Sequence, residues 1–418
     1  MKHKLMFALA GAALLSLPAG AAFAQQKKAE AKAAAVKLSD GMVKIGILTD
    51  LSGTYSDLAG AGSVLAAKMA IEDFQAREKG QAFKIELVSA DHQNKGDVAS
   101  NRAREWFERD QVDMIGDLVT TSTALAVMPV AKQMNRITIV SGAASTPITG
   151  SKQCTDTNVH YVYDTYALAN GTGKAVVKQG GDTWFFLTAD YAFGHALEKD
   201  TTATVIANGG KVLGSVRHPF PGTDFSSFLL KAQASGAKVI GLANAGTDTT
   251  NSIKQAAEFG ITPKQSLAGL LMFLTDVHSL GLKATQGMYL TEGFYWDLND
   301  ETRAWSKRFF EKHKRMPTMV QAGVYSSTLH YLKAVKAAGT DEAKAVMAKM
   351  KSTPINDFFA KNGKIREDGR HVHDFYLLQV KKPEESKYPW DYYHVRQVIP
   401  AAEAVMPVAQ SECPLLKK

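Results

Sequence analysis

The chain has 418 residues, of which 45% are hydrophobic and 22% charged, and its formal net charge is +8. This balance excludes collagen-like, wholly disordered and polytopic membrane chains. No basic run is long enough to follow a nucleic-acid backbone, and two cysteines exclude both a disulfide-dense miniprotein and a zinc site of four cysteines. The length allows two or three domains, each with a core of its own.

The first 24 residues are typical of a cleaved secretory signal. Lys2 and Lys4 precede an apolar stretch over residues 5–17, and Ala22-Phe23-Ala24 supplies the small residues expected before a signal-peptidase cut. The apolar stretch is shorter than the ~20 residues of a membrane span. We therefore expect cleavage after Ala24, export to the periplasm, and a flexible leader over 25–38.

Export places Cys154 and Cys413 in an oxidising compartment, and no catalytic His/Asn motif surrounds either residue. The expected outcome is a disulfide that pins the C-terminal tail, residues 401–418, to the body of the protein.

The first half of the mature chain alternates short apolar runs with segments of helical periodicity. Strands are predicted at 43–53, 83–91, 112–119 and 137–145, and helices at 62–79, 97–110 and 122–134. A second series then predicts strands at 183–194, 211–220, 238–246 and 265–273, and helices at 168–179, 195–208, 225–235 and 249–259. Such alternation indicates an α/β fold with two doubly wound, Rossmann-like lobes.

The remaining segments complete these lobes rather than forming a third domain. They predict a strand at 287–297, helices at 300–314, 318–338 and 341–350, and a hairpin at 364–382 with its turn at Asp368-Gly369. Lobe 1 would comprise 39–162 and 293–355, and lobe 2 would comprise 163–292 and 356–400. The chain would cross between them near Tyr163, Glu292 and Asn356. The Tyr/Trp-rich stretch 387–400 either packs across the lobes or covers a sheet edge.

Catalytic motifs are absent from the sequence. It contains no G-x-S-x-G, H-E-x-x-H or P-loop. His371 and His373 alternate on a predicted strand, and we expect exposed polar residues beside a turn rather than metal ligands. Asp91 and Asp190 follow strands, but nothing pairs them with a nucleophile. The sequence therefore predicts a protein that is not an enzyme and that holds no metal or cofactor.

Loops rich in small hydroxyl residues and glycine follow three strands of the first lobe, at 51–55, 120–123 and 141–147. Each alone is an ordinary helix N-cap. Together, at the carboxyl ends of one parallel sheet, they indicate a site where backbone N–H groups and hydroxyls satisfy a carboxylate.

Several motifs in one order carry a family resemblance. The export signal, VKIGILTDLSG, GDLVTTST, SGAASTP and LTADYAFG resemble the type I periplasmic binding proteins of ABC importers, over about residues 43–380. The similarity extends to the branched-chain amino acid receptors and to the branch that imports aromatic acids. It implies three crossovers between the lobes, a cleft that closes over a ligand, a monomer without a nucleic-acid partner, and delivery of the ligand to a permease.

The resemblance also implies site residues. A ligand carboxylate would be held by the hydroxyl of Thr121 or Ser122 and by Ala144 and Ser145. The aromatic side chain that covers the ligand from the second lobe would be Phe193, with Tyr191 nearby.

One departure from the amino-acid receptors concerns the ligand's ammonium group. The stretch 265–273 holds no acidic residue, and Asn244 and Gly246 offer an amide and backbone instead. An α-amino acid is therefore disfavoured unless Asp190 or Asp248 pairs with its ammonium group, because an unpaired buried charge is costly.

The apolar Leu271 and the rings of Tyr55, Phe193 and Phe273 suit a flat acid. The sequence thus predicts a receptor for an aromatic carboxylate. A branched-chain amino acid or amide receptor stays open as an alternative, as does a ligand-sensing partner of a membrane signalling protein.

Overall fold

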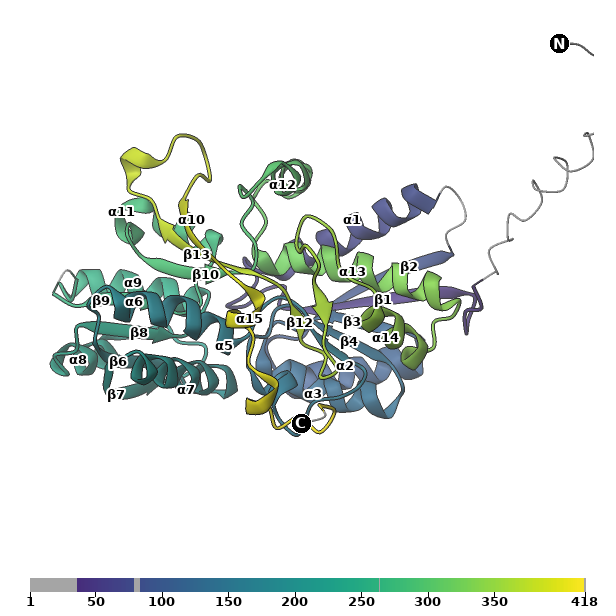
Figure 1. The fold of residues 1–418 in the computed structure, drawn as a ribbon, viewed down its shortest axis with the longest axis horizontal. Coiled ribbons are helices and arrows are strands. Elements are labelled where there is room, and N and C mark those ends of the chain that lie inside the picture. Colours follow the sequence, from purple (N-terminus) through teal and green to yellow (C-terminus); the bar gives the residue numbers. More distant parts are fainter. Residues whose placement is uncertain (1–35, 79–82, 263, 417–418) are drawn as a thin grey trace, which may run out of the picture. The chain divides into compact units, whose positions relative to one another are not determined.

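The computed structural model of the protein describes residues 36–78, 83–262 and 264–416 (Figure 1). The predicted signal, residues 1–24, and most of the leader lie outside these residues. The described end of the leader is held in place, since Lys37 donates its backbone N–H to the carbonyl of Gly339 at 2.8 Å. At residues 36–38 the leader is thus tied to the body, where the sequence predicts flexibility.

A five-stranded parallel sheet with the order β2-β1-β3-β4-β5 forms the centre of the first lobe. Its strands are β1 (Met42–Thr49), β2 (Lys84–Asp91), β3 (Met114–Asp117), β4 (Ile137–Val140) and β5 (Asn158–His160). The strands β1, β3 and β4 end before their predicted limits. In β3 the cause is local, because Asp117 and Leu118 adopt φ of 76° and 53° and turn the chain into the loop that follows.

Helices cover both faces of this sheet (Figure 1). One face carries α1 (Gly60–Glu78) and α13 (Met319–Ala338), and the other carries α2 (Gly96–Glu108) and α3 (Thr121–Gln133). Gly46 of β1 lets Trp106 of α2 lie directly on the sheet, since a Cβ at this position would come within 2.5 Å of the indole. The lobe is completed by α4 (Pro147–Gly150), α12 (Asp300–His313) and α14 (Ala343–Ser352).

The second lobe repeats the arrangement around a parallel sheet of order β7-β6-β8-β9. Its strands are β6 (Thr183–Ala189), β7 (Lys211–His218), β8 (Val239–Ala243) and β9 (Ser266–Gly269). Its helices are α5 (Thr165–Leu168), α6 (Lys174–Lys178), α7 (Ala192–Ala207), α8 (Ser226–Ala234), α9 (Thr247–Glu258), α10 (Leu274–Leu280) and α11 (Leu282–Thr285).

The predicted helix 168–179 is interrupted by a π-helical segment, Ala169–Gly173. Gly171 lies there against Thr291, and a Cβ at position 171 would come within 2.1 Å of the threonine hydroxyl. Thr172 and Thr291 share a hydrogen bond of 2.9 Å. Glycine at position 171 therefore leaves room for the Thr291 side chain to pack directly on this π-helical segment.

A third sheet has the order β10-β13-β14 and antiparallel pairing. It comprises β10 (Tyr289–Glu292), β13 (Phe375–Val380) and β14 (Tyr393–Ile399). The Tyr/Trp-rich segment supplies β14, and Trp390 stacks on His278 of α10 with ring centroids 3.9 Å apart. The segment forms a sheet edge, and it contacts both α10 and the residues that follow β10, since Trp296 donates to the carbonyl of Trp390 at 2.9 Å.

The predicted hairpin 364–382 exists only as a short pair, β11 (Lys364–Ile365) with β12 (His371–Val372), because β13 joins the third sheet instead. The expectation of exposed histidines was wrong. His371 and His373 are 0% and 3% exposed, and their rings lie 3.0 Å and 2.7 Å from the carbonyl oxygens of Tyr161 and Val162. Burial lowers the pKa of His373 to about 4.

His373 lies where the three connections between the lobes meet. Its ring contacts Val162 of the first connection, Gly293 of the second and Asp374 of the third. Arg370 extends the junction by donating to the Asp164 carboxylate at 2.7 Å, and both side chains are buried.

These contacts keep residues 364–372 with the first lobe and favour a third crossing near Asp374 rather than Asn356. The lobe limits themselves remain a proposal.

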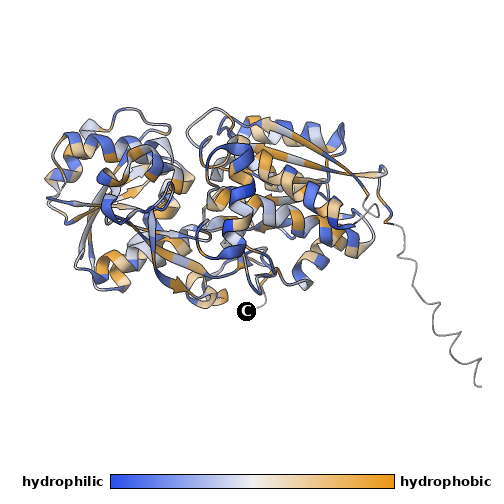
Figure 2. Cartoon of the chain, turned by 90° about the horizontal axis from the view of Figure 1, so that it is seen from above, coloured by the Kyte–Doolittle hydropathy of each residue, from blue (hydrophilic) through white to orange (hydrophobic). Residues whose placement is uncertain are grey.

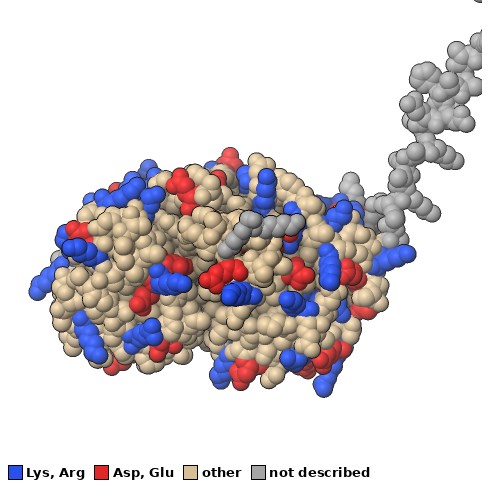
Figure 3. All heavy atoms as spheres, turned by 60° about the horizontal axis from the view of Figure 1, so that its bottom comes forward, with Lys and Arg blue, Asp and Glu red and all other residues tan. Residues whose placement is uncertain are grey.

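Hydrophilic residues lie on the outside of the fold, where charges of both signs are mixed (Figure 2, Figure 3). In Figure 2 the hydrophilic residues gather on the outer sides of the helices. Basic and acidic side chains are interspersed on the face that Figure 3 shows. None of the helices in the described ranges combines the length and the apolar character that a membrane crossing requires.

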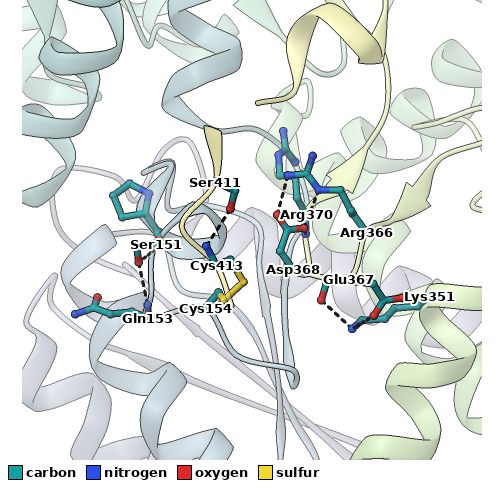
Figure 4. Close-up of a disulfide and its surroundings, with 11 residues drawn as sticks. Ser151, Gln153, Cys154, Lys351, Arg366, Glu367, Asp368, Arg370, Ser411 and Cys413 are labelled. Atoms are coloured by element: carbon teal, nitrogen blue, oxygen red, sulfur yellow. Dashed lines mark hydrogen bonds and ion pairs between the residues drawn. A yellow bond between two sulfur atoms is a disulfide. The ribbon is translucent and has the colours of Figure 1, made fainter. Parts of the chain in front are cut away.

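The predicted disulfide between Cys154 and Cys413 is present (Figure 4). It lies in a small apolar cluster with Leu416, and Glu412 donates its backbone N–H to Gly150 at 2.8 Å. The tail that it anchors also contains α15 (Ala401–Ala404), which packs near α5. The tail therefore contacts segments of both lobes.

Replacing both cysteines, as Cys154→Ser with Cys413→Ser, should destabilise the fold. The bond closes a separation of 259 residues, which on the chain-entropy account stabilises the native state by about 3–5 kcal/mol. Calorimetry should show a midpoint several degrees lower than that of the oxidised parent. The parent in reducing agent serves as the matched control, and equal midpoints for variant and oxidised parent would contradict this role.

Candidate functional site

A cavity lies between the lobes at the carboxyl ends of both parallel sheets, and its free volume in this structure is about 10 Å³. This is the position where open parallel sheets bind ligands, beside the point where strand order reverses. The first-lobe sheet reverses between β1 and β3, and the second between β6 and β8. The lining residues are Tyr55, Leu58, Val119, Thr121, Gly142, Ala144, Tyr163, Tyr191, Phe193, Ala245, Leu271 and Phe273.

The first-lobe wall carries hydroxyl groups and a helix N-terminus. The hydroxyls of Thr121 and Ser145 share a hydrogen bond of 2.7 Å, and Thr121 is the first residue of α3. No side chain caps α3. Its first-turn N–H groups therefore stay directed at the cavity end of the helix, where partial positive charge accumulates.

The second-lobe wall is aromatic and aliphatic. Tyr191 and Phe193 lie at the start of α7, with ring centroids 5.8 Å apart. Leu271 and Phe273 belong to the loop between β9 and α10, so the predicted strand 265–273 ends before them. The backbone N–H of Phe273 donates to Asp276 at 2.9 Å, which fixes this loop at the beginning of α10.

Direct contacts join the two lobes at the edge of the cavity. The hydroxyls of Tyr55 and Tyr191 share a hydrogen bond of 2.7 Å. Both rings stack on Phe220, with centroid distances of 5.5 Å for Tyr55 and 4.3 Å for Tyr191. Thr247 also donates its backbone N–H to the carbonyl of Thr54 at 3.3 Å. The loop that follows β1 therefore touches the loops after β6, β7 and β8.

Two of the predicted second-lobe residues lie outside the cavity. Asn244 is buried in a polar network with Thr249, Ser252 and His218. Gly246 has φ of 60° and lies so close to Thr54 that a Cβ would come within 2.4 Å of its carbonyl oxygen. Their neighbour Ala245 lines the cavity instead.

Two of the predicted first-lobe residues also do not line the cavity. Ser122 is half-buried and its hydroxyl lies 3.4 Å from that of Thr120. Ser145 lies behind the lining and reaches it only through Thr121. The structure does bring together Tyr55, Thr121, Ala144, Tyr191, Phe193, Leu271 and Phe273 around one cavity.

The residues that the sequence analysis missed are mostly small or apolar neighbours of predicted ones: Leu58, Val119, Gly142 and Ala245. Tyr163 is a different case, because it lies on the first connection between the lobes. Its hydroxyl donates to the carbonyl of Gly142 at 2.5 Å, and its ring meets Phe273 edge-on. Its only sequence signal is an aromatic residue at a predicted crossover.

No charged side chain lines the cavity. Asp190 faces solvent and pairs with His195 at 2.8 Å. Asp248 is buried behind Tyr55 and Tyr191, where it accepts from the backbone N–H of Gly222 at 3.1 Å. Burial raises the pKa of Asp248 to about 7 and that of Asp117 to about 6. Burial also raises the pKa of Glu292 well above its usual range.

Comparisons with known proteins match this architecture. Residues 42–386 match the family model described as periplasmic binding protein. The chain belongs to the periplasmic binding protein family. It is of the branched-chain amino acid ABC transporter type, and it has the type I fold with two lobes. Proteins of this kind bind substrates for transport in the periplasm and work with ABC transporter permeases.

Three solved structures illustrate the similarity. A periplasmic binding protein from Burkholderia mallei is 53% identical, with a TM-score of 0.88 and coverage of 90% of this chain and 100% of that one. A branched-chain amino acid ABC transporter periplasmic ligand-binding protein from Burkholderia xenovorans is 41% identical, with a TM-score of 0.78 and coverage of 89% and 99%. A solute-binding protein from R. palustris in complex with benzoate is 21% identical, with a TM-score of 0.75 and coverage of 86% and 97%, and shows the shared fold.

Groups of three or more metal-ligating side chains are absent from the part of this periplasmic binding protein that the structure describes. The cavity instead offers hydroxyls, backbone and rings. Such a surface binds a solute by hydrogen bonds and packing.

The loop that carries Phe273 should respond to pH through Asp276. Burial raises the pKa of Asp276 to about 7 in the folded protein, against an ordinary value of 3.8. Because the folded state holds this proton more tightly than the unfolded chain, the stabilisation is complete below pH 4 and is lost as the pH rises through 7. Asp276→Asn cannot ionise and should escape this loss.

Urea unfolding at pH 4.5, 6 and 7.5 tests this expectation. The free energy of unfolding of Asp276→Asn relative to the parent should rise with pH by roughly 2 kcal/mol or more. Asp190→Asn, at an exposed position, is the control and should show no such trend. Parallel pH profiles for the parent and Asp276→Asn would contradict the assignment.

Proposed function

We propose that this protein captures a small aromatic carboxylate in the cleft between its lobes and delivers it to the permease of an ABC importer. The observation that carries the proposal is the division of one uncharged cavity into two unlike walls. The first-lobe wall presents hydroxyls and uncapped helix N–H groups, and the second-lobe wall presents aromatic rings and leucine.

The hydroxyl wall supports an anionic group. Thr121 offers its hydroxyl to the cavity, Ser145 holds that hydroxyl from behind at 2.7 Å, and α3 directs its N-terminus at the same place. A carboxylate at a helix N-terminus is stabilised by N–H donors and by the helix dipole, so no arginine or lysine is required. Ala144 is small enough to leave room beside these donors.

The opposite wall supports a flat apolar body. Tyr191, Phe193 and Phe273 contribute rings, and Leu271 fills the space between the loops. Offset or edge-on contact between rings adds to the burial of apolar area. The free volume of about 10 Å³ is close to that of a single water molecule, so the lobes must move apart to admit a ring.

An α-amino acid fits this cavity less well. Its ammonium group would lie among residues without charge, and a buried unpaired charge costs several kcal/mol. Asp190 points into solvent, and Asp248 is separated from the cavity by tyrosines. The benzoate complex from R. palustris shows that the shared fold accommodates a small aromatic acid.

A second candidate is a branched-chain amino acid or amide. The description of the Burkholderia xenovorans protein favours it, because that protein is 41% identical to this chain. In this case Asp248 would have to ionise and reach the ammonium group between Tyr55 and Tyr191. The two candidates therefore make opposite demands on Asp248.

Closure of the lobes would complete the site. The ligand first meets the hydroxyl wall, and the second lobe then turns about the junction at His373 to cover it. Tyr55 contacts the second lobe in the closed arrangement and shields one side of the cavity. The ligand shifts the equilibrium from the open to the closed form, and the permease then recognises the closed form.

Thermal unfolding with candidate ligands tests the proposal. Benzoate at 100 times its Kd should stabilise the mature protein by about 2.7 kcal/mol and raise the midpoint by several degrees. L-leucine at the same concentration should have no effect. A shift with L-leucine alone would refute the aromatic-acid proposal and would direct attention to Asp248.

Variants locate the carboxylate. The double replacement Thr121→Ala with Ser145→Ala should weaken benzoate binding at least about tenfold, because it removes the hydroxyl that lines the cavity together with the hydroxyl that orients it. Ser122→Ala is the matched control, since Ser122 is one residue away but does not line the cavity. Calorimetric titration measures both, and an equal Kd for the double variant and the parent would place the carboxylate elsewhere.

A further inference from the structure

Tyr55 belongs to an irregular loop, residues 50–59, between β1 and α1. It lines the cavity, bonds to Tyr191 and stacks on Phe220. No helix or strand fixes its backbone. Something else must hold the loop in the shape that brings the ring to the second lobe.

The Asp50 side chain supplies this restraint. Asp50 is fully buried at the end of β1. One carboxylate oxygen accepts from the backbone N–H groups of Ser52 at 3.3 Å and Gly53 at 2.6 Å. The other accepts from the backbone N–H of Tyr55 at 2.8 Å and from the Nδ2 of Asn94 at 2.6 Å. A single carboxylate therefore binds three backbone amides of this loop and one side chain of the loop after β2.

The surrounding residues are fitted to this carboxylate. A Cβ at Gly53 would come within 2.9 Å of both carboxylate oxygens, so only glycine leaves room for the hydrogen bonds. Asn94 has φ of 57°, a conformation that asparagine tolerates better than most residues. The loop and the carboxylate thus form one unit with little freedom.

We propose that Asp50 is a positioning residue for ligand binding: it does not reach the cavity, but it holds Tyr55 in the orientation that closes the first lobe against the second. The inference rests on the cavity being the ligand site, as proposed above. It adds that closure depends on a restraint within the first lobe, and it does not depend on which ligand is bound.

The chemistry requires a carboxylate rather than an amide. Four N–H donors converge on two oxygens. An asparagine offers one oxygen, and in either orientation its NH₂ group faces N–H donors that then lack an acceptor. Asp50→Asn preserves the size of the side chain and removes one of its two acceptor oxygens.

A double-mutant cycle tests the proposal with four proteins: the parent, Asp50→Asn, Tyr55→Ala, and both changes together. The first readout is hydrogen exchange of single amides without ligand. The Tyr55 amide reports the restraint itself, and the Thr247 amide reports the contact between lobes, since it donates to Thr54. Asp113→Asn is the matched control, because Asp113 is also a buried first-lobe carboxylate that accepts a backbone N–H, at Lys44.

Asp50→Asn should accelerate exchange of both amides about tenfold, because the Tyr55 amide loses its own acceptor and the Thr247 amide loses the contact that the restrained loop maintains. In the Tyr55→Ala background the same change should accelerate Thr247 no further, because the two residues act in series. The Asp113→Asn control should leave Thr247 unchanged. A purely local role would speed exchange at Tyr55 alone, and that result, or an equal effect on Thr247 in both backgrounds, overturns the proposal.

The second readout uses benzoate as the probe in stopped-flow binding. Asp50→Asn should raise the dissociation rate about tenfold and leave the association rate within about twofold, because capture on the first lobe precedes closure. An increase confined to the association step overturns the proposal. If benzoate does not bind the parent, the aromatic-acid proposal fails, and the Thr247 exchange still decides the role of Asp50.

Discussion

The buried ion pair between Arg370 and Asp164 is the interaction on which the arrangement of the lobes depends. Its guanidinium also donates to the carbonyls of His160 and His371, so one side chain joins the first and third connections between the lobes. Asp164 in turn caps α5 by accepting from Ala167 at 2.8 Å. Removing one partner would leave a buried charge uncompensated, which is far costlier than the pair is stabilising. The junction is therefore held firmly.

The regular part of this architecture could be read from the sequence, because buried parallel strands are continuous apolar runs and each is followed by an amphipathic helix. Two residues that line the cavity, Thr121 and Phe193, were predicted from the motifs that carry the family resemblance. Ser122 was not separable from Thr121, since one residue turns a helix by 100°. The burial of His371 and the lining role of Tyr163 depend on connections that come together only in three dimensions.

The buried acidic residues around the cavity affect which charged ligands it can admit, in addition to the residues that line it. The nearby acids, Asp117, Asp248 and Glu292, are all buried and their pKa values are raised. Near neutral pH the raised pKa values reduce the negative charge that Asp248 and Glu292 carry, whereas Asp117, with a pKa of about 6, is largely ionised. An uncharged cavity of this kind disfavours an ammonium group, because no buried carboxylate lines it to offset the cost of desolvation.

The disulfide between Cys154 and Cys413 has a consequence for how the protein unfolds. The covalent loop that it closes contains the whole second lobe and the later helices of the first. Neither lobe can separate fully from the other in the oxidised chain, even when both are denatured. The disulfide thus lowers the entropy of the unfolded chain across segments of both lobes rather than within one lobe. Oxidation would favour a single cooperative transition, whereas reduction would let the lobes melt as separate units.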